Sequence, residues 1–219
     1  LKPFGLNKQE AKVTLPFASM TPNLDYDLPE SVLAWFKELD QKGRAAVAAA
    51  NWWQELLQRA RNEESNNFKV SVWPRERFPV HYVVGRTSPF YIEELFLSGL
   101  QPKAVWAVYF GPFTSNSMSH APLHGQGGAI ASVFDMITIH AAGKHYPHLK
   151  NLLATAQITV AFKRPAKPIP GVFKCEAWVD REDSKRIYVK AELSDGHGHL
   201  LDSCEAAVAK PKDATKSRL

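Results

Sequence analysis

The spacing of hydrophobic residues along the chain changes from a helical pattern to an extended one. From Gly127 to about Ala142, apolar residues occupy nearly all sides of a helical wheel, which predicts one helix that is buried on most sides. After this helix the pattern is typical of strands, because runs rich in Val, Ile, Thr and aromatic residues are separated by Pro, Gly or charged turns. The predicted strands are Ala154–Phe162, Val172–Val179, Arg186–Leu193 and Leu200–Ala209, together with Ala104–Phe110 before the helix.

The N-terminal part of the chain has a different pattern. Residues 1–28 are irregular, with several prolines and few periodic apolar positions. Pro29–Leu39 begins with proline and an acid, which is typical of a helix start, and Arg44–Arg61 predicts a second, Ala-rich helix. We expect Trp52 and Trp53 of this second helix to pack the N-terminal part against the main body.

The order of the elements indicates the fold class. One buried helix followed by antiparallel strands is typical of an α+β domain whose sheet wraps around the helix. Asp195–Gly198 gives a strong hairpin signal between the last two strands, whereas Phe90–Leu97 fits either a short helix or a strand. We therefore expect an irregular and mainly helical extension over residues 1–85, the main domain over 86–212 and a tail over 213–219.

The composition excludes several classes of protein. The 219 residues are 45% hydrophobic and 22% charged, which is ordinary for a globular chain long enough to bury a core. No apolar run reaches the roughly 18 residues of a membrane span. The net charge of +5 and the pI near 9.1 are compatible with nucleic-acid binding. However, the basic residues gather in Lys163–Lys167 and Lys210–Arg218 without interleaved aromatics, so we expect no nucleic-acid partner.

Neither the cysteines nor the histidines predict a metal site. Cys175 and Cys204 lie in separate strand-like runs, which favours reduced residues that pack in the core. His140, His145 and His148 have no cysteine or carboxylate that completes a ligand set. We therefore expect no bound metal.

The segment from Leu123 to Asp135 carries the candidate chemistry. A glycine-rich turn runs directly into the helix, whose first N–H groups and dipole favour a negatively charged group. Asp135 lies about two turns further along among apolar residues, where a carboxylate is expensive to desolvate unless it is paired or used. Together they point to chemistry on a carbonyl or a phosphate. The alternative is a structural acid that caps a backbone group or bonds Thr155.

Two motifs in this order resemble the acyl-CoA thioesterases of the phenylacetate-degradation and thioesterase-superfamily-member type. One is the run Gly127–Asp135, and the other is Thr155–Pro165, a strand that ends in a basic-Pro motif. The resemblance covers roughly residues 104–210 and implies the hotdog fold, an antiparallel sheet wrapped around one long helix. It also implies a homodimer, or a dimer of dimers, in which the helix start of one subunit lies beside the acid of its partner.

The resemblance implies a role for three residues. Asp135 activates water or attacks the thioester carbon, the backbone N–H of Gly127 polarises the thioester carbonyl, and Thr155 orients the acid or its water. The family motif usually contains His-Gly-Gly, but this chain has Gln126 directly before Gly127. Either His124, two residues earlier, folds back into the family position, or the Gln126 amide takes over.

A supporting polar residue that the family often carries upstream falls near His120. Lys163 and Arg164 are candidate contacts for the phosphates of coenzyme A, although a plain surface role fits them equally well. The expected reaction needs no metal or redox cofactor, since coenzyme A is part of the substrate. The sequence also contains no Gly-x-Ser-x-Gly nucleophile motif.

The first expected function is therefore an acyl-CoA thioesterase. A second interpretation keeps the fold but makes the chain an enoyl-CoA hydratase, which needs a histidine close to Asp135. A third is a module that binds acyl-CoA without turnover. The acyl chain length cannot be predicted from the sequence, because it depends on how residues 86–103 and a partner subunit close over the helix.

The tripeptide Ser217-Arg218-Leu219 is a conservative variant of the peroxisomal targeting signal, which an import receptor reads at the carboxyl end of a protein. It favours a peroxisomal location, with the cytoplasm or the mitochondrion as the alternatives. Because the sequence begins with Leu1 rather than Met, the presence of an amino-terminal targeting segment is left open.

Overall fold

The computed structural model describes residues 30–62, 68–72, 83, 88–97, 102–115, 124–150 and 152–211. Three predictions fall outside these ranges and stay predictions. They concern the irregular residues 1–28, the supporting role of His120 and the targeting tripeptide Ser217-Arg218-Leu219.

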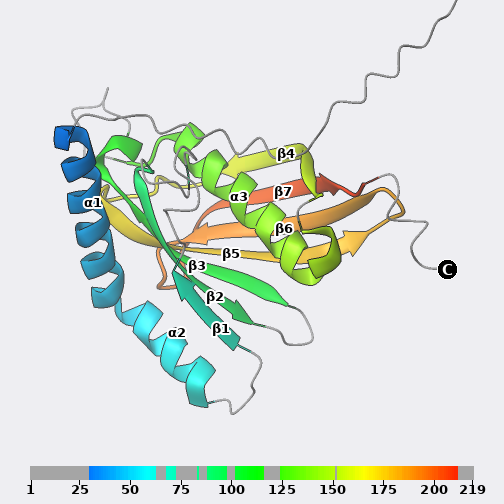
Figure 1. The fold of residues 1–219 in the computed structure, drawn as a ribbon, viewed down its shortest axis with the longest axis horizontal. Helices are drawn as coiled ribbons and strands as arrows, with labels where there is room; N and C mark the ends of the chain where they lie inside the picture. Colours follow the sequence, from blue (N-terminus) through cyan, green and yellow to red (C-terminus); the bar gives the residue numbers. More distant parts are fainter. Residues whose placement is uncertain are drawn as a thin grey trace, which may run out of the picture.

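The described residues form three helices and one seven-stranded antiparallel sheet, in the strand order β1-β2-β3-β5-β6-β7-β4 (Figure 1). The strands are β1 (Phe68–Val72), β2 (Phe90–Leu97), β3 (Lys103–Phe110), β4 (Ala154–Phe162), β5 (Gly171–Glu182), β6 (Arg186–Ser194) and β7 (Leu200–Ala209). The helices are α1 (Glu30–Ala49), α2 (Asn51–Asn62) and α3 (Gly127–His145), and the 3-10 turns are η2 (Pro112–Thr114) and η3 (Pro147–Leu149). None of these helices is long and apolar enough to cross a membrane.

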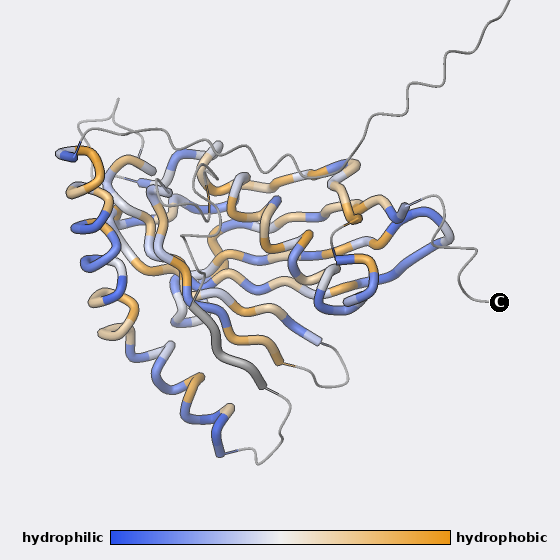
Figure 2. Tube along the Cα trace, in the orientation of Figure 1, coloured by the Kyte–Doolittle hydropathy of each residue, from blue (hydrophilic) through white to orange (hydrophobic). Residues whose placement is uncertain are grey.

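The central helix α3 packs against one face of the sheet, as the sequence predicted. Its buried side chains, among them Phe134 and Ile137, form a single core with the inward-facing residues of the strands. Figure 2 shows hydrophobic residues along most of its length. The helix therefore covers one face of the sheet, and this packing fixes where the residues at its start and on its open face can lie.

The opposite face of the sheet is covered in part by the N-terminal helices. Alternate residues of β2 and β3 point away from α3 and form a second core with α1 and α2. Trp53 is fully buried there and donates a hydrogen bond from Nε1 to Glu93 at 2.9 Å. The prediction that these tryptophans pack the N-terminal part against the main body is confirmed.

The sheet is covered on both faces at Phe90–Leu97, which explains why the sequence pattern of this segment fits either a helix or a strand. This segment is strand β2, and its side chains are buried on both sides of the sheet, so the apolar residues do not alternate with polar ones. In strand β6, by contrast, buried residues alternate with more accessible ones.

The predicted break between the two N-terminal helices is wrong. Helix α1 continues through Gly43 to Ala49, and the chain turns at Ala50 instead. The physical reason is tertiary, because a side chain at position 43 would overlap the side chain of Tyr91 on β2. Glycine at this position lets the helix backbone approach the sheet closely.

This close approach predicts opposite effects for the same substitution at two glycines. Gly43→Ala is expected to lower the free energy of unfolding by about 1–3 kcal/mol, because the new methyl group meets Tyr91. Gly128→Ala in α3 is the matched control, since its methyl group meets nothing closer than 4.0 Å, and it is expected to stabilise by up to about 1 kcal/mol. Urea denaturation of both variants measures the two effects, and equal effects would contradict the packing of α1.

Candidate functional site

The start of α3 is held by the loop that precedes it. The N–H of Gly125 donates to the Ala166 carbonyl at 2.8 Å, and the N–H of Gln126 donates to the Thr114 carbonyl at 2.7 Å. Gln126 is the N-cap residue with extended backbone, and its side chain forms no capping hydrogen bond. The N–H groups of the first turn, beginning with Gly127, therefore remain available to a ligand.

A cavity of about 310 Å³ opens at this end of α3. It is lined by the loop before the helix, by the helix start, by the end of β4 with the residues that follow it, and by one residue of β7. These residues are His124, Gly125, Gly127, Ile130, residues 162–166 and Asp202. Exposed Lys163 and Arg164 give it a positive rim.

The structure thus brings together four of the predicted site residues, His124, Gly127, Lys163 and Arg164. Of the two candidates for the family histidine position, half-buried His124 lines the cavity, whereas Gln126 is exposed. Gln126 nevertheless lies close to the start of the helix, with its side-chain amide beside Gly128.

Asp135 lies on the open, half-buried face of α3, two turns beyond the helix start. Burial, together with the negative charges of Asp135 and Glu205, raises the pKa of the Cys204 thiol on β7 to about 12. Within the described part of the chain no residue forms a hydrogen bond or an ion pair with the Asp135 side chain. The interpretation of Asp135 as a structural acid bonded to Thr155 therefore finds no support.

Thr155 lies near the start of β4, beside an irregularity in the pairing of β4 with β7 between Thr155 and Gln157. Its hydroxyl oxygen is buried and has no hydrogen-bond partner among the described residues. The structure does not bring Thr155 and Asp135 into contact through a hydrogen bond within one chain.

Asp202 of β7 is a residue of this cavity that the sequence analysis missed. It is only 1% exposed, and its Oδ1 accepts a 3.3 Å hydrogen bond from the Lys163 N–H, which also donates to the Leu201 carbonyl at 3.1 Å. Burial raises the pKa of Asp202 to about 6, against the opposing effect of the Lys163 N–H and ammonium. The feature of the sequence that could have indicated Asp202 is an acid at an inward-facing position of a predicted strand, two residues before Cys204.

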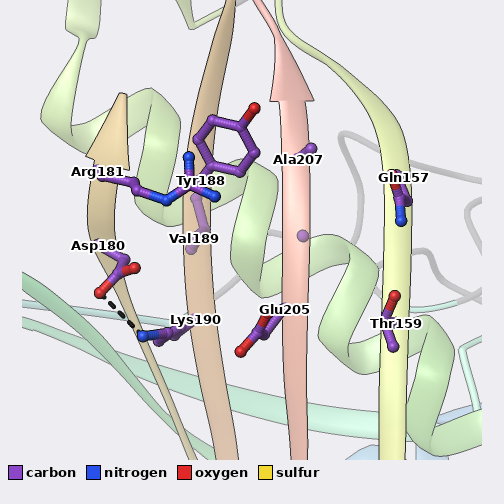
Figure 3. Close-up of a pocket in the computed structure, with 10 residues that line it drawn as sticks. Gln157, Thr159, Asp180, Arg181, Tyr188, Val189, Lys190, Glu205 and Ala207 are labelled. Carbon is purple, nitrogen blue, oxygen red and sulfur yellow. Dashed lines mark hydrogen bonds and ion pairs between the residues drawn. The ribbon is translucent and has the colours of Figure 1, made fainter. Parts of the chain in front are cut away.

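A second cavity, of about 200 Å³, lies on the face of the sheet that points away from α3 (Figure 3). Two of its cations have partners, since Lys190 forms an ion pair with Asp180 at 3.1 Å and the Arg181 guanidinium lies 3.5 Å from the centre of the Tyr188 ring. None of the predicted site residues lines it. We therefore place the candidate site at the start of α3.

Comparison with known proteins gives a family match over the part of the chain that contains this cavity. Residues 126–201, which begin at the N-cap of α3 and end in β7, match the family model of the thioesterase superfamily. No curated protein matches the chain. The resemblance to hotdog thioesterases and the predicted fold class, an antiparallel sheet around one long helix, are confirmed. The match supports a thioesterase-type function.

Several solved structures align with about half of this chain. A phenylacetic acid degradation-related protein from Ralstonia eutropha JMP134 is 20% identical, with a TM-score of 0.41 over 49% of this chain and 75% of that one. Zebrafish thioesterase superfamily member 2 is 17% identical, with a TM-score of 0.46 over 57% and 83%. A Bacillus halodurans protein solved with CoA is 14% identical, with a TM-score of 0.41 over 48% and 65%. At these values the likeness carries no information about substrate.

The burial of Asp202 predicts a pH-dependent stability. Its pKa of about 6 in the folded chain exceeds the ordinary value near 3.9, so folding favours the protonated form. The stabilising contribution is complete below about pH 4 and is lost as the pH rises through about 6, which amounts to roughly 3 kcal/mol. Denaturant titrations measure the free energy of unfolding of Asp202→Asn and of wild type. The value for the variant minus the value for wild type should rise by this amount between pH 4 and pH 7.

The exposed Asp180 provides a control, because Asp180→Asn removes a carboxylate from the outer face of the sheet without changing the buried one. A difference between Asp202→Asn and wild type that stays constant over this pH range would contradict the assignment of a raised pKa to Asp202.

Proposed function

We propose that the chain is an acyl-CoA thioesterase that hydrolyses the thioester of a fatty or related acyl-CoA to the free acid and coenzyme A. The observation that carries the proposal is the pair of reactive groups on α3. The helix begins with uncapped N–H groups at a cavity, and it carries, two turns later, a half-buried carboxylate without a described partner.

The chemistry of hydrolysis fits these groups. In the proposed reaction Asp135 accepts a proton from a water molecule as the water oxygen bonds to the thioester carbon. The negative charge that develops on the carbonyl oxygen is stabilised by the Gly127 N–H and by the helix dipole. The carbon–sulfur bond then breaks, the thiolate leaves with the electron pair, and the proton passes to it. No metal or redox cofactor is needed for this reaction.

The spacing of the two groups favours a site shared between two subunits. Asp135 follows Gly127 by eight residues, which corresponds to about 12 Å along a helix. One thioester cannot span that distance between its carbonyl oxygen and the attacking water. A second copy of the chain, with its α3 side by side in the opposite direction, brings its own Asp135 to the Gly127 N–H.

Strand β4 offers a contact for such a dimer. It is the last strand in the sheet order, all nine of its residues are half-buried or exposed, and the Phe162 ring is 56% exposed. An edge strand of this kind presents unpaired backbone groups to another chain. We propose that a homodimer or a dimer of dimers forms through this edge, where the Thr155 hydroxyl finds its partner.

Lys163 and Arg164 at the rim of the cavity are proposed to contact the phosphates of coenzyme A. The hydratase alternative is weaker, because it needs a histidine beside Asp135. His140, on the same helix, is bound instead to Glu94 of β2 at 2.6 Å. The alternative of binding without turnover is an outcome of the experiments below.

Asp135→Asn is expected to lower kcat by about 10²–10⁴-fold, because an amide cannot accept the proton of the attacking water. The measurement is the release of free thiol from short, medium, long and aromatic acyl-CoAs. Glu205→Gln, which neutralises an exposed acid on the outer face of β7, is the control and should keep full activity. An Asp135→Asn variant as active as wild type would contradict the proposed role.

Proline removes the Gly127 N–H at a position that a helix tolerates, and the Cβ that proline and alanine both add meets the Phe162 ring at 3.2 Å. Gly127 is the first helical residue, a position that accepts proline, and Gln126 before it has the extended backbone that proline requires. Gly127→Pro is expected to lower kcat by about 10²–10³-fold, whereas Gly127→Ala, which keeps the N–H, should stay within a few-fold of wild type. Equal losses in both variants would point to steric effects instead.

Mixing the two inactive variants tests whether the site is shared. In a mixed dimer of Gly127→Pro and Asp135→Asn, one of the two sites combines an intact Gly127 with an intact Asp135 from different subunits. Random exchange of subunits should restore about a quarter of the wild-type activity, because half of the dimers are mixed. No recovery in a mixture that demonstrably exchanges subunits would show that each site lies within one chain.

A further inference from the structure

The proposed reaction assigns no role to Asp202, the buried acid that lines the cavity. Among the described residues, the Asp202 carboxylate accepts a hydrogen bond through Oδ1 only, from an N–H group that also donates to the Leu201 carbonyl. Its Oδ2 is buried and has no hydrogen-bond partner within the described residues. A buried carboxylate oxygen without a donor is unfavourable, and such groups in folded proteins usually have a ligand, a water molecule or a function.

Asp202 lies at the same end of the cavity as the helix start. It pairs across the strands with Phe162, and the Phe162 ring packs against Gly127, because a methyl group placed on Gly127 would lie 3.2 Å from that ring. Asp202 and Gly127 both line the cavity. One cavity is therefore lined by a residue with a hydrogen-bond donor, the Gly127 N–H, and by a residue with a hydrogen-bond acceptor, the Asp202 carboxylate, and the Phe162 side chain is a common neighbour of both.

A ligand that satisfies both groups needs a carbonyl oxygen and, a few bonds away, an N–H group. The walls beside them are apolar, with Ile130 and Ala166, so a short methylene segment between the two polar groups fits the lining. Thioesters of coenzyme A have this order of groups, since two methylene carbons separate the thioester sulfur from the nearest amide nitrogen.

Resting on the proposed function, we propose that Asp202 is a substrate-binding residue whose Oδ2 accepts a hydrogen bond from the amide N–H nearest to the thioester sulfur. Asp202 then selects thioesters of amide-bearing thiols over thioesters of other thiols. It fixes the thiol side of the substrate, while the Gly127 N–H fixes the carbonyl side.

The test compares two thioesters that differ in this N–H alone. One is the thioester of N-acetylcysteamine, and the other is the thioester of 2-mercaptoethyl acetate, in which an ester oxygen replaces the amide N–H. Hydrogen bonds to charged groups typically contribute enough for a preference of about 10–100-fold in kcat/KM for the amide. Asp202→Leu should lower this preference to near one, and Asp202→Asn, which keeps a neutral acceptor, should leave a smaller preference.

The ratio of the two kcat/KM values in each variant, divided by the ratio in wild type, cancels the different reactivity of the two thiols. Asp180→Asn, with a carboxylate removed from the outer face, should keep the wild-type ratio. The same ratio in wild type, Asp202→Leu and Asp202→Asn would overturn the proposal and leave the thioesterase function intact. In that case the hydrogen-bond partner of Oδ2 would be a water molecule. If Asp202→Leu does not fold, the comparison with Asp202→Asn decides.

Binding separates this inference from the proposed function. Calorimetric titration of Asp135→Asn with the two thioesters measures affinity without turnover. The inference is supported if Asp135→Asn binds the amide-bearing thioester more tightly than the ester, and if the double variant with Asp202→Asn loses this preference. This result would stand even if wild type hydrolyses neither compound and the thioesterase proposal fails. Equal affinities for the two thioesters would overturn it.

Discussion

The packing of α3 against one face of the sheet is the interaction on which the rest of the structure depends. The helix contributes Ile130, Val133, Phe134 and Ile137 to the core, and the strands surround them with apolar side chains. Burying side chains of this size contributes about 1.5–3 kcal/mol each. Because the helix is fixed along its length, its start and its open face are fixed as well.

This constraint places two chemically different groups on one rigid element. The start of the helix presents N–H groups to a cavity, and the open face carries Asp135 about 12 Å further along. A rigid helix cannot bring its own two groups together, so the proposed site needs a second copy of the chain. The accessible edge strand β4 fits the same requirement, and so does the buried hydroxyl of Thr155, which has no hydrogen-bond partner among the described residues.

Much of this arrangement could be predicted from the sequence, because it rests on local patterns. The all-round apolar run from Gly127 predicted α3, and the strands after it agree closely with β4, β5, β6 and β7. The glycine turn and Asp135 lie on one helix, so their spacing follows from helix geometry alone. His124, Gly127, Lys163 and Arg164 were predicted separately, and the structure brings them to one cavity.

The remaining features depend on contacts between distant segments. The continuation of α1 through Gly43 follows from the fit of its backbone against Tyr91, a contact that no local pattern reveals. Asp202 is a single acid in a strand, and its importance depends on the pairing that places it beside Phe162 at the start of α3. His124 lines the cavity and Gln126 is exposed because of the conformation of the loop before α3. Backbone hydrogen bonds to Thr114 and Ala166 fix this loop.

The most direct test of the account is the release of coenzyme A by the unaltered chain. Purified protein is incubated with a panel of acyl-CoAs, and the free thiol is measured over time together with the binding of each compound. The account predicts saturable hydrolysis of at least one acyl-CoA that binds. Acyl-CoAs that bind at the start of α3 but release no thiol would contradict it and would make the chain a binding module.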